Sequence, residues 1–226
     1  MVIIMKELFK KLKINPKNLQ LYEQAFIHTS YAYENELPYS YETLEFLGDA
    51  IVDLVVSDYL YKEKDFSEGV MTKMRASYVC ENALYEYAND LNLSEYIKLG
   101  KGEINTDGSH KKAILSDIFE ALMAAIYLDL GYEKTKEVAL SIIVPYIEDE
   151  NIVLFSDYKS ELQETVQDVQ KSLQYNLLEE TGPAHDRRFK VAVMIDDVVY
   201  GEGSGHTKKE AEQEAAKSAL KKLVKK

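Results

Sequence analysis

Acidic side chains occur inside an apolar stretch of the sequence, at spacings that place them on one face of a helix. The stretch is YETLEFLGDAIVDLVVSDYLY, Tyr41 to Tyr61. Read as a helix, it carries one strip of acids that continues into valines. The acids of this strip are Glu42, Glu45, Asp49 and Asp53. A solvated face would not turn into valines, so the pattern predicts carboxylates on a surface that is to be buried.

A second apolar stretch, ILSDIFEALMAAIYLDL from Ile114 to Leu130, places Asp117 and Glu120 on one face with alanines. Isolated ionised carboxylates in an apolar setting cost several kcal/mol each, so they must be protonated, paired with cations or bound to metal. Oxygen ligands without a histidine pair or thiolate favour hard cations, Mg²⁺ or Mn²⁺, over zinc. The two helices together therefore predict a site for such a cation.

Each acidic pair also has a purely structural interpretation. The first two acids of the first stretch would lie in a first helical turn, where the helix dipole favours negative charge. Asp117 and Glu120 have the spacing of a capping box with Asp as the cap. Asp49, however, lies beyond a first turn and follows Gly48. Glycine costs about 1 kcal/mol in a helix interior, which is expected only where something approaches the backbone closely. Taken together, the acids favour the metal site.

Length and composition limit the alternatives. The chain has 226 residues with 46% hydrophobic content, enough for one large domain or a large and a small one. A single cysteine excludes an internal disulfide framework, and no run approaches the length of a membrane span. The apolar patch at the amino terminus is too short for a signal peptide, so a cytoplasmic protein without a membrane partner is expected.

The net charge of −12 argues weakly against a nucleic-acid partner, since phosphate binding usually needs a basic footprint. The charge is uneven: residues 1–154 hold 15 Lys/Arg and 26 Asp/Glu, whereas residues 155–226 hold 12 and 13. Any nucleic acid must therefore be held by local basic patches or through metal ions.

The same division appears in the periodicity of the sequence. The first part has helical periodicity throughout, over residues 5–13, 18–33, 42–62, 68–88, 91–97, 112–130 and 133–147. The second part predicts a helix near 157–170, three strands, LQYNLLEE, RRFKVAVMI and VVYGEGS, and a helix from Lys208 onward. We expect an all-α domain over 1–147, a linker over 148–156, and a small α+β domain of order α-β-β-β-α over 157–226, with its helices on one face of an antiparallel sheet.

Five motifs in a fixed order carry a family resemblance. They are HTSY at 28–31, LEFLGDA at 44–50, SEGVMTKMRAS at 67–77, LGKGE at 99–103 and ILSDIFEA at 114–121. In this order the chain resembles the bacterial ribonuclease III family over nearly its whole length. LEFLGD followed by D-x-x-E in an all-α domain is a highly specific combination. The chain departs from the family pattern at Thr43, where Arg is usual, and at Tyr33, where Asn is common; neither is a presumed ligand.

The resemblance implies roles for residues at matching positions. The metal-binding carboxylates would be Glu45, Asp49, Asp117 and Glu120, of which Asp49 and Glu120 are the catalytic pair. Glu42 and Glu68 would be additional acids beside the RNA; an acid before Gly69 could also simply start a helix.

The end of the chain resembles the family's double-stranded-RNA-binding domain. Thr207 and Glu210 have capping-box spacing, which places Lys208 and Lys209 in the first helical turn, where the dipole disfavours cations. A phosphate would offset that cost, although a solvated charge pair is the alternative. TKKEAE matches the family's phosphate-binding motif and favours the phosphate. The resemblance also implies RNA contacts for other side chains, which are Ser160, Gln163 and Glu164 on the first helix and His185 in the loop after Gly182.

As a whole, the resemblance implies an endoribonuclease that cleaves double-stranded RNA by Mg²⁺-dependent hydrolysis, with Mn²⁺ able to substitute. It would leave 5′-phosphate and 3′-hydroxyl ends, act in rRNA and mRNA processing, and form a homodimer through its helical domain. Phe46 is expected at the dimer contact, with core packing as the alternative. A non-catalytic double-stranded-RNA-binding regulator would have no use for the acids. A helical hydrolase of small phosphate esters would give no role to the second domain.

Overall fold

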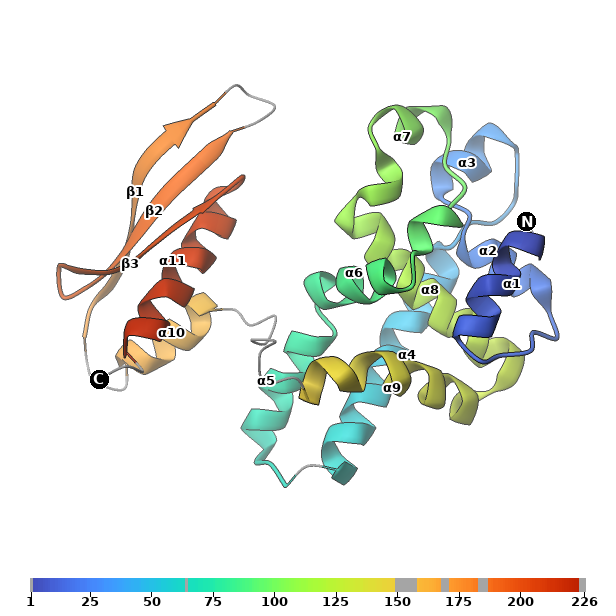
Figure 1. Cartoon of the computed structure of the whole chain (residues 1–226), viewed down its shortest axis with the longest axis horizontal. Coiled ribbons are helices and arrows are strands. Elements are labelled where there is room, and N and C mark those ends of the chain that lie inside the picture. Colours follow the sequence, from blue (N-terminus) through green and yellow to red (C-terminus); the bar gives the residue numbers. More distant parts are fainter. Residues whose placement is uncertain (1, 64, 149–157, 168–170, 183–186, 224–226) are drawn as a thin grey trace. The chain divides into compact units, whose positions relative to one another are not determined.

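The computed structural model describes residues 2–63, 65–148, 158–167, 171–182 and 187–223. The chain divides into two compact units, Met1–Phe155 and Ser156–Lys226 (Figure 1). Of the predicted linker, Glu148 is the last residue of a helix, and residues 149–156 lie outside the described part. None of the helices in the described part combines the length and apolar content needed to cross a membrane.

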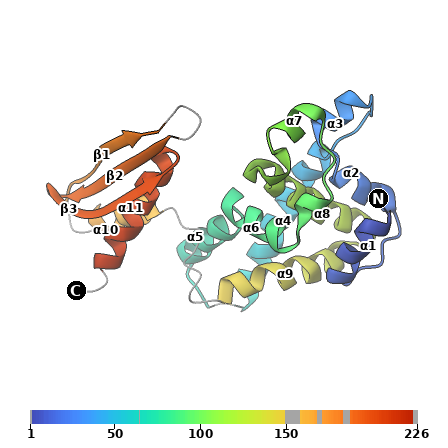
Figure 2. The ribbon, with the colours of Figure 1, turned by 45° about the horizontal axis from the view of Figure 1, so that its top comes forward.

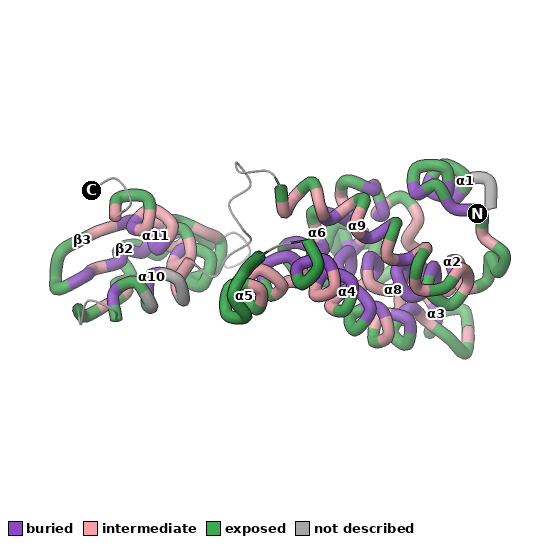
Figure 3. Tube along the Cα trace, turned by 90° about the horizontal axis from the view of Figure 1, so that it is seen from below, coloured by how far each residue is buried: buried purple, intermediate pink, exposed green. Residues whose placement is uncertain are grey.

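The first unit is helical, as predicted. Its α-helices are α1 (Val2–Lys11), α2 (Leu19–Ala25), α3 (Thr29–Glu34), α4 (Glu42–Glu63), α5 (Glu68–Tyr78), α6 (Glu81–Asp90), α7 (Lys101–Asn105), α8 (Lys112–Leu130) and α9 (Tyr132–Glu148), with short 3₁₀ turns at Leu93–Glu95 and Gly108–His110. α4 and α8 pack together at the centre of the unit (Figure 2). The buried positions follow these two helices, whereas α5 is largely exposed (Figure 3).

α8 supplies the middle of the hydrophobic core because it is apolar on nearly every side. Leu115, Ile118, Phe119 and Leu122 are fully buried. Burial of such side chains contributes roughly 1.5–3 kcal/mol each relative to exposure. A helix held on all sides in this way can carry polar groups at fixed positions.

Two predicted helices are each broken into two. The segment 18–33 is interrupted between α2 and α3, where the backbone of Ile27 forms an isolated bridge with Lys98 and the His28 side chain caps α3. The segment 68–88 is interrupted after Tyr78, because Cys80 adopts an extended backbone before α6 begins. Tertiary and capping contacts thus break the first helix that periodicity suggested, and an extended residue breaks the second.

The prediction also missed α7, and residues 91–97 contain only a 3₁₀ turn. α7 has five residues, too few to be stable by propensity alone. Its start is held from elsewhere in the chain: the Gly100 N–H donates to Ser30 Oγ at 2.9 Å and the Lys101 N–H to Glu34 Oε1 at 2.8 Å.

The second unit has the predicted order α-β-β-β-α. Its elements are α10 (Tyr158–Gln167), β1 (Leu173–Thr181), β2 (Arg188–Ile195), β3 (Val198–Gly205) and α11 (Lys208–Leu223). The strands form an antiparallel sheet of order β1-β2-β3, and both helices lie on the same face (Figure 1, Figure 2). Alternate β2 residues, beginning with Val191, pack against Leu162 of α10 and the buried alanines of α11.

Candidate active site

A backbone contact between α4 and α8 fixes the geometry of the site. Gly48 is buried at this crossing, and a Cβ atom added to it would lie 2.0 Å from the backbone oxygen of Glu120. Only glycine fits at that separation. Glu45 precedes Gly48 by about one helical turn, and Asp117 precedes Glu120 by the same spacing. The crossing therefore brings the acids of the two helices to one place.

Three of the predicted ligands converge there. Glu45, Asp117 and Glu120 each offer one carboxylate oxygen, and these oxygens lie within 4.8 Å of one another. Mg²⁺ binds oxygen at about 2.1 Å, so two ligands on opposite sides of the ion lie about 4.2 Å apart. Small side-chain movements would let the three residues, called here the carboxylate trio, share one cation. Their oxygen-only donor set suits Mg²⁺ or Mn²⁺.

Electrostatics show how a cation would stabilise the trio. Burial raises the pKa of Glu120 to about 8, and the charges of Asp49, Asp117 and Glu45 act in the same direction. Burial also raises the pKa of Glu45 and of Asp117. The charges acting on Glu120 all come from carboxylates. A divalent cation would relieve this repulsion and favour the ionised forms.

Asp49, the fourth predicted ligand, does not belong to the trio. It is exposed, and it is close enough for its charge to raise the pKa of both Glu45 and Glu120. Glu42 is also exposed, at the start of α4, and accepts a hydrogen bond from Ser40 Oγ at 3.3 Å.

The expectation that the whole acidic strip is buried was wrong. The trio is half-buried, while Glu42 and Asp49 face solvent. The reason is that α4 packs on the core by one face only: Phe46 and Leu54 on its other face are 83% and 54% exposed. The acids lie at the border between the two faces, where a charged ligand can reach them.

The capping interpretation of Asp117 and Glu120 was also wrong. α8 begins at Lys112, with Lys111 as its N-cap, so Asp117 lies more than one turn inside the helix. Glu42 and Glu45 do lie in the first turn of α4, where the dipole favours them. That stabilisation is compatible with ligand binding by Glu45.

Sequence reasoning overlooked Tyr41. Its hydroxyl donates a hydrogen bond to Asp117 Oδ2 at 2.9 Å, although Tyr41 lies 76 positions away in the chain. In the sequence, a tyrosine just before an acidic helix start looks the same as a core residue, so nothing indicated that Tyr41 would contact Asp117. Thr43 accepts a hydrogen bond from Gln24 Nε2 at 3.2 Å, and Tyr33 is exposed. Neither departure from the family pattern touches the trio.

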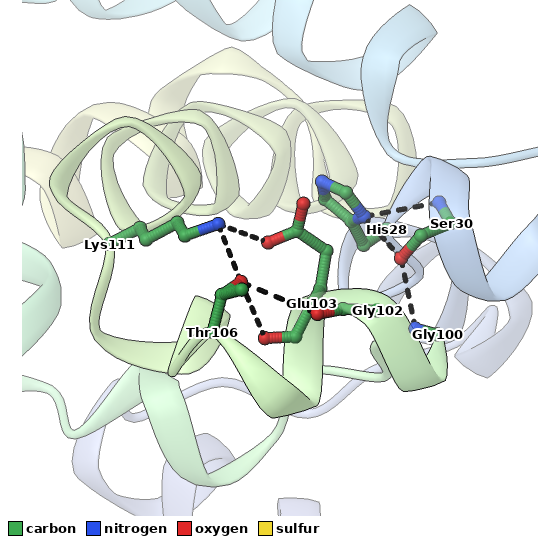
Figure 4. Close-up of polar contacts among 7 residues, drawn as sticks. All are labelled: His28, Ser30, Gly100, Gly102, Glu103, Thr106 and Lys111. Atoms are coloured by element: carbon green, nitrogen blue, oxygen red, sulfur yellow. Dashed lines mark hydrogen bonds and ion pairs between the residues drawn. The ribbon is translucent and has the colours of Figure 1, made fainter.

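Figure 4 shows the polar contacts around Glu103 and around His28. The Glu103 carboxylate accepts from Lys111 Nζ at 2.6 Å, and it points toward the ring of His28. His28 has a structural role: its Nδ1 accepts from the Ser30 N–H at 3.1 Å and caps α3. Burial lowers the pKa of His28, and the charges of Glu103 and Asp117 oppose that shift. The LGKGE motif thus supplies a carboxylate near the site that was not predicted.

The remaining acid, Glu68, lies apart from the trio. It occupies the first turn of α5 and accepts from Thr72 Oγ1 at 3.1 Å. It lines a groove of about 380 Å³ between α4 and α5, together with Leu54, Tyr61 and Arg75.

The residues predicted to bind phosphate lie at the start of α11. The Glu210 N–H donates to Thr207 Oγ1 at 3.1 Å, and the Thr207 N–H donates to Glu210 Oε2 at 3.3 Å, which completes the capping box. Lys208 and Lys209 are exposed in the first turn. Lys208 Nζ lies 5.7 Å from the centre of the Phe189 ring. Two lysines thus stand where unpaired backbone N–H groups and the dipole already favour an anion.

Of the other predicted RNA contacts, Gln163 is exposed on α10. Ser160 and Glu164 also belong to α10, but their side chains lie outside the described part of the structure. His185 lies outside the described residues altogether.

Comparison with protein families agrees with this arrangement. A model described as "Ribonuclease-III-like" matches residues 18–147, and a model described as "Double-stranded RNA binding motif" matches residues 158–223. The chain belongs to the ribonuclease III family. A ribonuclease-III-like unit joined to such a motif makes the chain an endoribonuclease acting on double-stranded RNA.

Individual members of the ribonuclease III family are also similar to this chain. Ribonuclease 3 of Onion yellows phytoplasma is 48% identical over 219 residues, covering 96% of this chain and 91% of that protein. Ribonuclease 3 of Listeria monocytogenes is 45% identical over 222 residues, covering 96% and 97%. The nuclease domain of ribonuclease III from Campylobacter jejuni superposes with a TM-score of 0.58 at 39% identity, covering 62% of this chain and 96% of that one. The chain therefore shares both its sequence and its helical unit with known members of the family.

The Gly48 contact yields a first prediction. Replacing Gly48 with Ala places a methyl group against the backbone of Glu120, so we expect the free energy of unfolding to fall by about 1–3 kcal/mol. Cleavage of RNA should fall as well, because α4, which carries Glu45, must move relative to α8, which carries Asp117 and Glu120. Gly69→Ala is the matched control, since a Cβ on Gly69 of α5 meets no atom within 4 Å. Urea denaturation followed by circular dichroism compares them, and equal stability of the two variants would contradict the close-contact explanation.

Proposed function

We propose that this protein hydrolyses phosphodiester bonds of double-stranded RNA at a Mg²⁺ site formed by Glu45, Asp49, Asp117 and Glu120, with Mn²⁺ able to substitute. The observation that carries the proposal is the convergence of the trio's oxygens within 4.8 Å, with only carboxylate charges acting on Glu120. A bound Mg²⁺ would supply Lewis acidity for the attack of water on the phosphodiester.

The residues of this proposed site have different roles. Glu45, Asp117 and Glu120 hold the cation from two helices whose separation is fixed at Gly48. Asp49, exposed beside the trio, faces the side from which RNA would approach, and with Glu120 forms the proposed catalytic pair. Glu42 and Glu68 would contact the RNA on either side.

We propose that the second unit binds the duplex through Lys208, Lys209 and Gln163, and through Ser160, Glu164 and His185 as the family pattern implies. The lysines would contact phosphates, while the polar side chains would contact 2′-hydroxyls in the wide minor groove of A-form RNA. Binding would follow the shape of the duplex and not its sequence. The domain boundaries predicted from the sequence, 1–147 and 157–226 with a linker over 148–156, are part of this proposal.

Membership of the family also supports a proposal about the products of RNA cleavage and its cellular role. We propose that cleavage leaves 5′-phosphate and 3′-hydroxyl ends and serves rRNA and mRNA processing in the cytoplasm. A purely RNA-binding regulator is less well supported, because it gives no role to half-buried carboxylates that repel one another.

We further propose a homodimer formed through the helical unit. The Campylobacter jejuni structure is described as showing flexibility in a region involved in dimer formation of the nuclease domain. In this chain, the outer face of α4 exposes Phe46 by 83%, Leu54 by 54% and Tyr61 by 77%. Core packing of Phe46, the alternative considered from sequence, is therefore wrong. A two-fold dimer would present one site to each strand of a duplex.

The metal site is tested by Glu120→Gln, which keeps the size of the side chain and removes its charge. We expect cleavage of long duplex RNA in Mg²⁺ to fall more than about 100-fold while duplex binding persists. EDTA should abolish cleavage by the unsubstituted protein. Glu133→Gln, on the exposed surface of α9, makes the same charge change away from the site and should cleave normally. Undiminished cleavage by Glu120→Gln, or cleavage that survives EDTA, would refute the proposal.

RNA binding is tested by replacing Lys208 and Lys209 with Ala. Each lost phosphate contact should reduce the slope of log affinity against log salt by about 1, for every duplex sequence. The control replaces Lys221 and Lys222 with Ala, which removes the same amount of charge from the last turn of α11. Filter binding over a range of salt concentrations measures both slopes. If the two double variants behave alike, the phosphate site is not at the start of α11.

The dimer is tested by Phe46→Ala. Loss of this apolar side chain from the contact should raise the dimer dissociation constant at least tenfold, at about 25 cal/mol for each Å² of buried apolar area. Tyr33→Ala is the control, because Tyr33 on α3 is an equally exposed aromatic residue. Sedimentation over a concentration series gives the constants. A Phe46→Ala protein that dimerises as well as Tyr33→Ala would exclude Phe46 from the contact.

A further inference from the structure

Tyr41 is attached at three points, and the third is a member of the carboxylate trio. Its N–H donates to the backbone oxygen of Ile27 at 2.9 Å, and its ring packs against the His28 ring at 5.7 Å. Its hydroxyl donates to Asp117 Oδ2 at 2.9 Å. The residue is only 4% exposed. Its backbone and ring are thus held before the hydroxyl reaches Asp117, so the direction of that hydrogen bond is fixed.

The segment behind Tyr41 is itself held by hydrogen bonds. The backbone N–H of His28 donates to the Lys98 backbone oxygen at 3.1 Å, and the ring Nδ1 of His28 accepts from the Ser30 backbone N–H. Ser30 Oγ in turn accepts from the Gly100 N–H at 2.9 Å (Figure 4). A Cβ atom on Gly100 would lie 2.8 Å from the Ser30 backbone oxygen, so the segments are in close contact. Residues 98–100 thus hold residues 28–30 in place, and Tyr41 packs against His28.

A second tyrosine–aspartate pair in the same unit provides a comparison. Tyr22 Oη donates to Asp129 Oδ2, also at 2.9 Å. Asp129 additionally accepts from the N–H groups of Lys17 and Asn18, both at 2.8 Å. Three donors from the chain satisfy that carboxylate, which is the pattern of a structural link.

Asp117 is different. Among the described residues, Tyr41 is the one hydrogen-bond donor to its carboxylate. A carboxylate has about four lone-pair positions, and the hydroxyl occupies one, which leaves the others for a ligand. The neighbouring Glu45 and Glu120 repel Asp117, so without the hydroxyl its side chain would turn away from them.

We propose that Tyr41 is a positioning residue that holds the Asp117 carboxylate toward Glu45 and Glu120, ready to bind the divalent cation. The inference rests on the proposed function, since it requires the trio to be a cation site. Fixing the carboxylate beforehand removes the cost of ordering it when the cation binds. Tyr41 itself touches neither cation nor RNA.

The test compares Tyr41→Phe with Tyr22→Phe, because each removes one hydroxyl from an aspartate and leaves the ring in place. Mn²⁺ is the probe, and its binding to the full-length protein without RNA is measured by calorimetry and by electron paramagnetic resonance. We expect Tyr41→Phe to raise the Mn²⁺ dissociation constant about tenfold. The Mg²⁺ concentration for half-maximal cleavage should rise by a similar factor, while the rate at saturating Mg²⁺ changes less.

Tyr22→Phe should lower the free energy of unfolding without changing Mn²⁺ affinity. Circular dichroism confirms that both variants are folded at the assay temperature; should Tyr41→Phe not fold, Tyr41→His, which keeps a ring at this position, takes its place. In an Asp117→Asn background, Tyr41→Phe should cause no further loss of affinity. Equal Mn²⁺ affinity of the Tyr41 variant and the Tyr22 variant overturns the positioning role and leaves the metal site standing. An unsubstituted protein that binds no Mn²⁺ overturns both proposals.

Discussion

The close approach of α4 and α8 at Gly48 is the constraint on which the site depends. A side chain at that position would meet the backbone of Glu120, so the two helices could not cross where they do. The acids of α4 and α8 are each correctly spaced along their own helix, but they become one group only at this crossing. A shift of the helices by the width of a methyl group would separate carboxylate oxygens that now lie within 4.8 Å. The core around α8 resists such a shift because its apolar side chains are fully buried.

The site is unfavourable to the folded chain by itself. Half-buried carboxylates raise one another's pKa, and Glu120 reaches about 8. Such a group stabilises the fold only where it is protonated: its contribution is complete below the unfolded pKa, near 4.5, and is lost as the pH rises through about 8. Near neutral pH and above, ionisation therefore carries a cost that a divalent cation offsets. The same repulsion that penalises the metal-free protein would give the proposed site its affinity for a cation.

The chain and RNA are both negatively charged, and the two units would overcome this repulsion in different ways. The helical unit is acidic and would attract phosphate only through a cation in the trio. The second unit is nearly neutral and concentrates Lys208 and Lys209 at the start of α11, where helix geometry adds to their effect. A chain with a net charge of −12 can therefore bind a polyanion, because the charge that matters is local.

By itself, the sequence determined the fold class, the α-β-β-β-α order of the second unit, and the acids that form the site, because periodicity and spacing act along a single element. Tertiary structure decided the rest. It broke two predicted helices near Ile27 and Cys80, formed α7 from contacts with Ser30 and Glu34, and left Asp49 exposed beside the trio. It also joined Tyr41 to Asp117 across 76 positions. Such contacts depend on where helices cross and how their faces pack, and no local pattern of residues records the distance between two separate elements.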